Sequence, residues 1–132
     1  MTATFNRVEL YDNDIGLNVN PFNNTVSTRV TVTDSVAAGN FIGFEIVAPG
    51  SAAAASTLTV VRSVVANNVG IGSGTGLVAD GANATVRLGQ STVTGNDIGW
   101  RATGGALLQS FGDNYIAGNG DNDPAPPTIA RK

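Results

Sequence analysis

The sequence predicts an all-β fold, a parallel β-helix of about five stacked coils. Three observations lead to this prediction. β-Branched residues, Gly and Asn are abundant, a short pattern recurs about every 28 residues, and apolar and polar residues alternate beside it. β-Branched residues favour strands, while Gly and Asn favour turns. A period of roughly 20 to 50 residues is typical of stacked repeats.

The composition of the chain argues against several classes of function. The chain has 132 residues, the size of one domain, and contains no Cys and no His, so it lacks thiol chemistry and the commonest general base. Seven Lys and Arg against ten Asp and Glu, without a basic run, argue against a nucleic-acid partner. The chain also shows no apolar stretch long enough to span a membrane and no signal peptide.

The recurring pattern is Ser-x-apolar-x-x-Asn, at residues 35–40, 63–68 and 91–96, with weaker copies at 8–13 and 114–119. Its asparagines are 27, 28, 28 and 23 residues apart. In a stack of coils, each side-chain amide can donate to the next Asn and accept from the last, and Asn also tolerates a left-handed corner. We therefore expect a structural ladder of Asn13, Asn40, Asn68, Asn96 and Asn119.

The first strand of each coil precedes the pattern, where apolar and polar residues alternate as in half-buried strands. Thr4, Thr31 and Thr59 belong to the polar, outward set. Counting from the Ser position gives two apolar columns that we expect in the core. They are Phe5, Val32, Val60, Leu88 and Phe111, three residues before it, and Leu10, Ala37, Val65, Val93 and Ile116, two residues after it.

A further strand follows each Asn, in "DIGLNV" (14–19), "FIGFEI" (41–46) and "DIGWRA" (97–102). Here the alternation places Ile15, Ile42 and Ile98 inward, followed by Leu17, Phe44 and Trp100. The third repeat does not follow the alternation of the others over residues 69–79, and either Ile71 or Leu77 can take the core position there. Gly-rich turns such as "ADGA" (79–82) lead into the next coil.

Several segments resemble right-handed parallel β-helix proteins of the pectate-lyase-like superfamily. "FNRVE", "VTDSVAAGN", "RLGQSTVTGN" and "FGDNYIAGNGDND…PPTIARK" look like the C-terminal half of uncharacterised bacterial β-helix proteins of the Rhizobiales type. The resemblance implies a right-handed, single-stranded β-solenoid with coils of 23–28 residues. It also implies a longer, secreted or extracytoplasmic parent protein, of which this chain is an excised or redesigned fragment.

We expect one domain over residues 1–123 and a Pro-rich tail over 124–132. We also expect an exposed charge ladder of Arg7, Asp34, Arg62 and Asp113, because these residues precede the Ser position of successive coils, with Gln90 between the last two.

We interpret the residues that could form a catalytic or metal site as structural. Lyases of the resembled superfamily are expected to bind Ca²⁺ through clustered carboxylates, but Asp14 and Asp97 lie three coils apart. "NGDND" (119–123) is followed by Pro124 where a calcium loop has Gly, and no Glu comes after it. Trp100 falls in a core position rather than on a sugar platform. We expect no catalytic residue, metal or cofactor.

The sequence therefore favours a structural or interaction solenoid without catalysis of its own, with carbohydrate as an alternative weak ligand. The alternative function is part of a polysaccharide-degrading enzyme of the pectate-lyase type. The strand around Ala3 to Leu10 should expose an unpaired edge, while the Pro-rich tail and Ile129 close the other end. We therefore expect a two-fold homodimer formed through the N-terminal coil.

Overall fold

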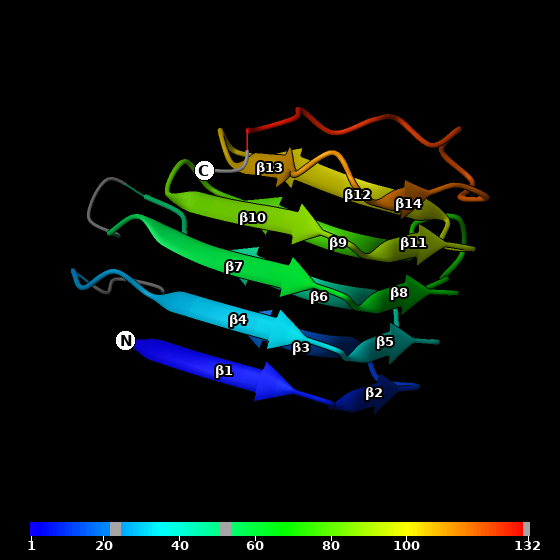
Figure 1. Ribbon diagram of the computed structural model, residues 1–132, viewed down its shortest axis with the longest axis horizontal. Coiled ribbons are helices and arrows are strands. Elements are labelled where there is room, and N and C mark those ends of the chain that lie inside the picture. Colours follow the sequence, from blue (N-terminus) through cyan, green and yellow to red (C-terminus); the bar gives the residue numbers. More distant parts are fainter. Residues whose placement is uncertain (22–24, 51–53, 131–132) are drawn as a thin grey trace.

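The computed structural model describes residues 1–21, 25–50 and 54–130, and over these residues it is an all-β solenoid without helices. The chain makes about four turns (Figure 1). The strands are β1 (Thr2–Asn6), β2 (Glu9–Tyr11), β3 (Ile15–Val19), β4 (Arg29–Thr33), β5 (Val36–Ala38), β6 (Ile42–Val47), β7 (Ser56–Val61), β8 (Val64–Ala66), β9 (Thr75–Asp80), β10 (Ala84–Gly89), β11 (Thr92–Thr94), β12 (Ile98–Thr103), β13 (Leu107–Ser110) and β14 (Tyr115–Ile116).

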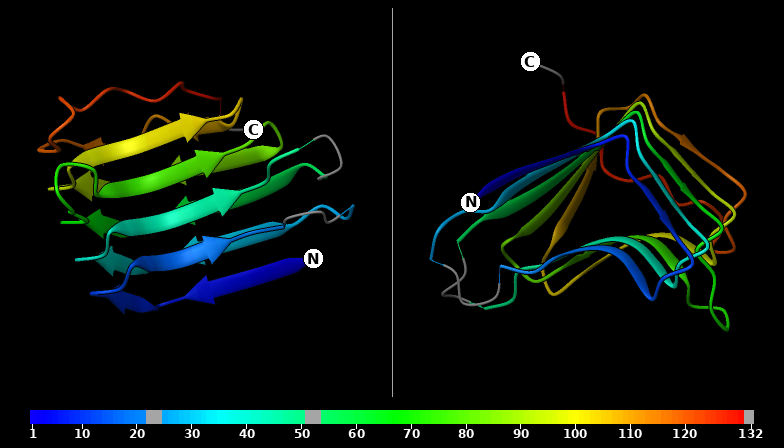
Figure 2. Two further views of the ribbon diagram at one scale, coloured as in Figure 1. Left: turned by 180° about the vertical axis from the view of Figure 1, so that it is seen from behind. Right: turned by 90° about the horizontal axis from the view of Figure 1, so that it is seen from below.

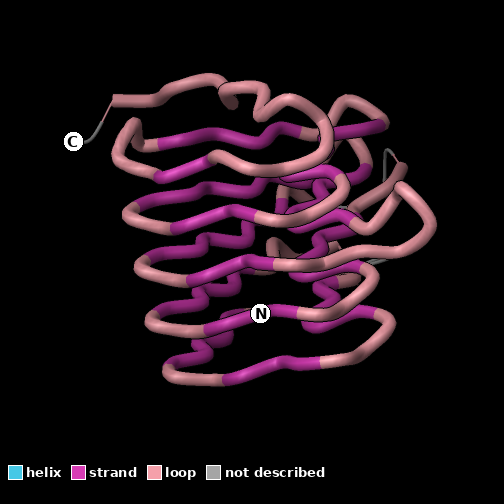
Figure 3. Tube along the Cα trace, turned by 90° about the vertical axis from the view of Figure 1, so that its right-hand side faces the viewer, coloured by secondary structure: helices cyan, strands magenta, loops and turns pink. Residues whose placement is uncertain are grey.

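Strands that recur at the same place in each turn pair in parallel and form three sheets. Their orders are β1-β4-β7-β10-β13, β2-β5-β8-β11-β14 and β3-β6-β9-β12, which we call sheets A, B and C. Seen along the solenoid axis, the three sheets enclose a triangular core (Figure 2). The coils lie directly above one another (Figure 3), so each strand depends on the coils above and below for its backbone hydrogen bonds.

The predicted alternation of the first strand is confirmed in the central coils. Val32, Val60 and Leu88 stack in register and are fully buried, while Thr31 and Thr59 lie on the outer face. The second predicted column follows the same rule, with Ala37, Val65 and Val93 fully buried. At the two ends Phe5, Leu10 and Ile116 pack against this core but are only half-buried, because they have a neighbouring coil on one side only.

The prediction for Phe111 is wrong by one residue. Leu88 pairs with Ser110 rather than with Phe111, so Leu108 and Ser110 point into the core. A methyl group on Gly89 would lie 2.9 Å from Cδ2 of Phe111, which places this ring against Gly89 on the outer face. The last coil has an extra corner residue between β13 and β14, and counting back from the Asn pattern therefore shifts the register.

In sheet C the core position of the third repeat belongs to Leu77. Leu17, Phe44, Leu77 and Trp100 stack in register, whereas Ile71 is fully exposed on a loop. Ile42, predicted to lie inward, is buried, whereas Ile15 and Ile98 are only half-buried, and none of the three belongs to the central hydrophobic cluster. The alternation is interrupted at the glycine that follows each isoleucine, where an added methyl group on Gly43 would meet the buried Val65 and Asn68.

Candidate functional site

The Asn ladder runs the length of one corner and is directional. In each step the backbone N–H and the Nδ2 amide of one Asn donate to Oδ1 of the Asn one coil further on. The backbone N–H of Asn68 donates to Oδ1 of Asn96 at 3.0 Å, and Nδ2 of Asn68 donates to the same oxygen at 2.8 Å. The same Nδ2 groups also donate to core-strand carbonyls, such as that of Ala37. Asn40, Asn68, Asn96 and Asn119 are buried, so the predicted amide stack is present.

The left-handed corner that we expected at the asparagines lies one residue earlier. Positive φ angles occur at Asp12, Gly39, Asn67, Gly95 and Gly118, each of which directly precedes a ladder Asn. Gly, Asn and Asp adopt this region more readily than other residues, which explains the composition of this position. The ladder asparagines therefore serve through their side chains and backbone N–H groups, and the residue before each of them makes the corner.

The C-terminal end of the ladder is closed by a carboxylate. Oδ1 of Asp123 accepts the backbone N–H of Asn119 at 2.9 Å and its Nδ2 at 2.7 Å, while Oδ2 accepts the N–H of Gly118 at 2.9 Å. Hydrogen bonds from Asn119 and Gly118 lower the pKa of Asp123. Asp123 thus takes the position that a further ladder Asn would have.

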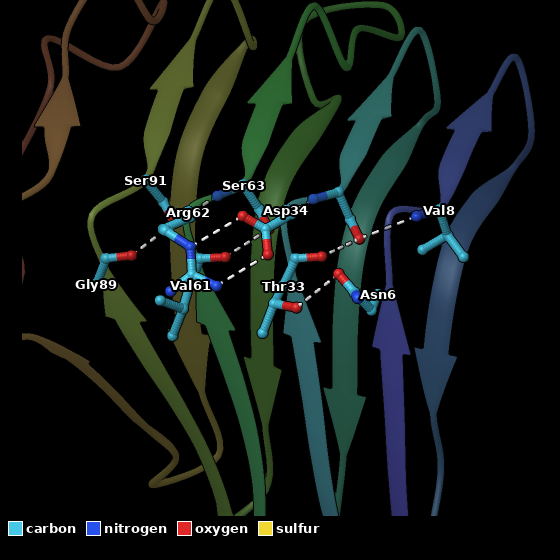
Figure 4. Close-up of polar contacts among 10 residues, drawn as sticks. Asn6, Val8, Thr33, Asp34, Val61, Arg62, Ser63, Gly89 and Ser91 are labelled. Atoms are coloured by element: carbon cyan, nitrogen blue, oxygen red, sulfur yellow. Dashed lines mark hydrogen bonds and ion pairs between the residues drawn. The ribbon is translucent and has the colours of Figure 1, made fainter.

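A second ladder links the corners between sheets A and B. Ser35, Ser63 and Ser91 are buried, and the Oγ of each accepts the backbone N–H of the equivalent residue in the preceding coil, which is Val8, Ser35 and Ser63 in turn. Figure 4 labels Val8, Ser63 and Ser91 of this ladder. Oδ1 of Asn114 accepts the N–H of Ser91 and finishes this ladder. In the first coil Val8 replaces Ser and supplies no side-chain acceptor.

At the N-terminal end of the solenoid, the first coil is not covered by any of the residues that the structure describes. No described segment lies below β1, β2 and β3 (Figure 1), and Ala3, Phe5, Leu10 and Leu17 are half-buried there. Arg29 donates its N–H to the carbonyl of Met1, and Arg7 donates to that of Thr33. By the parallel alternation, the N–H and C=O groups of the even-numbered residues of β1 point to the open side. Oδ1 of Asn13 has no partner among the described residues.

The C-terminal end is covered by the polypeptide that follows β14. The segment crosses the open end of the triangle (Figure 2) and buries Pro126. Its Pro127 carbonyl accepts the N–H of Ser110, and its Ile129 N–H donates to the carbonyl of Ser110, both at 2.8 Å. Trp100 donates its indole N–H to the carbonyl of Pro124. We call residues 123–130 the cap.

The predicted charge ladder has one ion pair at its centre. Arg62 donates from Nε and Nη2 to both carboxylate oxygens of Asp34 at 2.9 and 2.8 Å (Figure 4). This bidentate contact lowers the pKa of Asp34 and raises that of Arg62, and Arg7 lowers the pKa of Asp34 further through its charge. Asp113 accepts the backbone N–H of Gln90. Both members of the ion pair are exposed on the surface.

Two carboxylates in or next to sheet C, Glu45 and Asp97, have structural partners. Oδ2 of Asp97 accepts the N–H groups of Gly70 and Gly74, which hold the loop that carries Ile71 and lower the pKa of Asp97. Glu45 accepts Nδ2 of Asn18, and burial together with the charge of Asp80 raises the pKa of Glu45.

No group of three or more acidic side chains that could hold a metal ion occurs in the described parts of the chain, residues 1–21, 25–50 and 54–130. The same residues contain no helix long and apolar enough to cross a membrane.

A glycine column was not recognised in the sequence. Gly16, Gly43 and Gly76 stand beside the Asn ladder, where an added methyl group would lie about 2.6, 2.5 and 2.6 Å from the carbonyl oxygen of the next glycine in the stack. The column continues at Gly99. Because backbone cannot move aside cheaply, these positions require Gly. The recurrent "IG" of three repeats was the available signal.

Comparison of the chain with protein families, with curated proteins and with solved structures finds no match. The geometry described above is therefore the basis for assigning a function.

Proposed function

We propose that this protein is a structural solenoid module that acts by binding a second copy of itself through its N-terminal end, and that it has no catalytic activity. The observation that carries the proposal is the inequality of the two ends. The N-terminal end combines three unpaired strand edges with half-exposed core residues, whereas the C-terminal end carries the cap.

Exposed strand edges and apolar core together favour association. An unpaired edge offers a row of hydrogen-bond donors and acceptors to another strand, and each buried Å² of apolar surface contributes about 25 cal/mol. Phe5, Leu10 and Leu17 provide the apolar surface, and the open side of β1 provides the backbone groups. A second copy supplies the same combination.

A closed pair is the expected assembly. When the same surface of two copies meets, the contact is two-fold and cannot grow further. The cap occupies the other end of each chain, which leaves the N-terminal end as the available surface. We therefore expect a dimer rather than a fibre.

The test is light scattering at micromolar concentration. We expect twice the 13.3 kDa of one chain for the wild type and a monomer for Leu10→Lys, which places a charge on the N-terminal end. Tyr11→Lys is the matched control, because it adds the same charge to the next residue on the exposed outer face of β2 and should leave the dimer intact. A monomeric wild type, or equal behaviour of the two variants, contradicts the proposal.

A further inference from the structure

The direction of the Asn ladder makes the two ends of the solenoid complementary. Every Asn donates toward the C-terminal end and accepts from the N-terminal side. The N-terminal end therefore presents an acceptor, Oδ1 of Asn13. The C-terminal end presents two donors, the N–H and Nδ2 groups of Asn119, which are held by Asp123.

The strand edges at the two ends match as well. Sheet A ends in β1 and β13, sheet B in β2 and β14, and sheet C in β3 and β12. If a second copy is placed as the next coil, its strands meet these edges in parallel, the orientation found throughout the solenoid. The inward columns then continue, with Leu10 above Ile116 and Leu17 above Trp100.

The cap imitates such a coil at two points. Asp123 accepts the Asn119 donors at 2.9 and 2.7 Å, close to the 3.1 and 2.8 Å at which Asn119 accepts those of Asn96. Thr128 forms a parallel bridge with Ser110, flanked by the bonds of the Pro127 carbonyl and the Ile129 N–H. In a docked second copy, the carbonyl of Thr4 and the N–H of Asn6 would occupy these two places, since both point to the open side of β1.

The cap is a shorter substitute than a full coil. It takes a direct path across the end of the triangle, as Figure 2 shows, and leaves an open cavity of about 230 Å³. The cavity is lined by Asn114 and Ile116 of the last coil and by Asp123 and Pro126 of the cap, among other residues. A complete coil pairs along all three sheets and fills this space.

We infer that the cap, residues 123–130, is an autoinhibitory segment that occupies the docking surface for the N-terminal end of a second copy, so that its release permits head-to-tail stacking. The inference rests on the proposed function, because it uses the same N-terminal end as the donor surface. Head-to-tail contact is heterologous and does not close, so released chains form open assemblies.

The experiment uses the whole 132-residue chain with a loosened cap. Asp123→Ala removes the three hydrogen bonds to Gly118 and Asn119, and Ile129→Pro removes the donor to Ser110, while no residue of a coil core changes. Adding Leu10→Lys to this double variant closes its N-terminal end, so that only its C-terminal end is open. Asp123→Asn is the matched control, because it keeps the Oδ1 acceptor and should keep the cap.

Light scattering and tryptophan fluorescence provide the readouts. We expect the double variant to form assemblies that grow with concentration, and the triple variant to bind wild type in a 1:1 complex. The emission of Trp100 should shift to longer wavelength before assembly, as its contact with Pro124 is lost.

The outcomes separate this inference from the proposed function. If wild type is a monomer but binds the triple variant, the two-fold dimer is wrong and the head-to-tail surface stands. If wild type is a dimer, and the variants release the cap without growing or binding, the autoinhibitory role is wrong. An unchanged Trp100 emission would also contradict it, since the removed hydrogen bonds would then not hold the cap.

Discussion

The central and terminal coils carry the same side-chain columns, but only the central coils bury them completely. Val65 in the middle of its column is fully buried, while Leu10 at the end of the same column is half-buried. The same contrast holds for Asn68 and Asn13. The stability of a coil thus depends on its two neighbours, as in a one-dimensional array of repeats.

The two terminal coils differ from each other as well. The last coil is covered by a segment that satisfies its ladder donors, whereas the first coil leaves an acceptor, three strand edges and apolar side chains uncovered. Because the ladder is directional, an acceptor such as the Asp123 carboxylate can finish only the C-terminal end. This difference is the reason why we propose the N-terminal end as the interaction surface.

The largest expected effect contrasts Val65→Asp with Leu10→Asp. Burying an unpaired carboxylate at position 65 should cost at least about 3 kcal/mol and abolish soluble folding. The same change at position 10 should leave a folded protein, because the carboxylate can reach water at the open end. Soluble yield and circular dichroism measure both, and equal tolerance at the two positions would overturn the register. Thr59→Ala, on the outer face, should be nearly silent.

Asn68→Ala should destabilise the fold by about 1 to 3 kcal/mol, because it leaves the buried N–H of Asn40 without an acceptor. Asn13→Ala should change the free energy of unfolding by less than about 0.5 kcal/mol, since this side chain is exposed at the ladder end. Urea denaturation of the two variants gives the comparison. A larger loss for Asn13→Ala would show that the first coil is not an open end.

Gly43→Ala should cost about 1 to 3 kcal/mol, because the new methyl group would lie 2.5 Å from the carbonyl oxygen of Gly76. Gly99→Ala in the last turn should cost less, since its closest contact is the side-chain amide of Asn119 at 3.1 Å. Thermal melting compares them. If Gly99→Ala is the more damaging change, the ladder amide is more rigid than the backbone of the central coil.

Acid should release the cap before it affects the central coils. The pKa of Asp123 is lowered in the folded protein, so its hydrogen bonds stabilise the cap above the unfolded pKa of about 3.9, and this contribution is lost as the pH falls through the lower folded value. Trp100 emission should therefore shift below about pH 4 in the wild type. The shift should be absent in Asp123→Asn, and an identical profile in that variant would assign the transition to another group.

A small effect is expected at the charge ladder. Arg62→Ala removes the exposed ion pair with Asp34, whose contribution is limited by solvent. The melting temperature should fall less than in any buried variant above, and the difference should vanish in high salt. A salt-independent loss would indicate that Arg62 has a role beyond this pair.

The sequence was sufficient to predict the parallel solenoid, because stacked coils need the same type of residue at each equivalent position and the repeat shows that pattern. The columns around Val65 and the Asn ladder follow directly from the repeat. The alternation rule failed where the period changed, at the extra corner residue before β14, and it misplaced Phe111 for that reason. In sheet C it overstated the burial of Ile15 and Ile98, which are only half-buried.

The end structures were only partly predictable. Proline and Ile129 indicated that the tail could close the last coil, but the role of Asp123 depends on a left-handed turn that places its carboxylate under Asn119. No repeat register relates Asp123 to the Asn column, since its carboxylate belongs to the segment that follows the last ladder residue, Asn119. The open acceptor at Asn13 likewise became visible only once the ladder direction was known.

Amide hydrogen exchange at several protein concentrations tests the unequal ends most directly. We predict that the amides of Thr2, Thr4 and Asn6, on the open side of β1, gain protection as the concentration rises. The amides of Ser110 and Asn119, which are bonded to the cap, should be protected at every concentration. Concentration-dependent protection at Ser110 and Asn119, with β1 unchanged, would contradict the account.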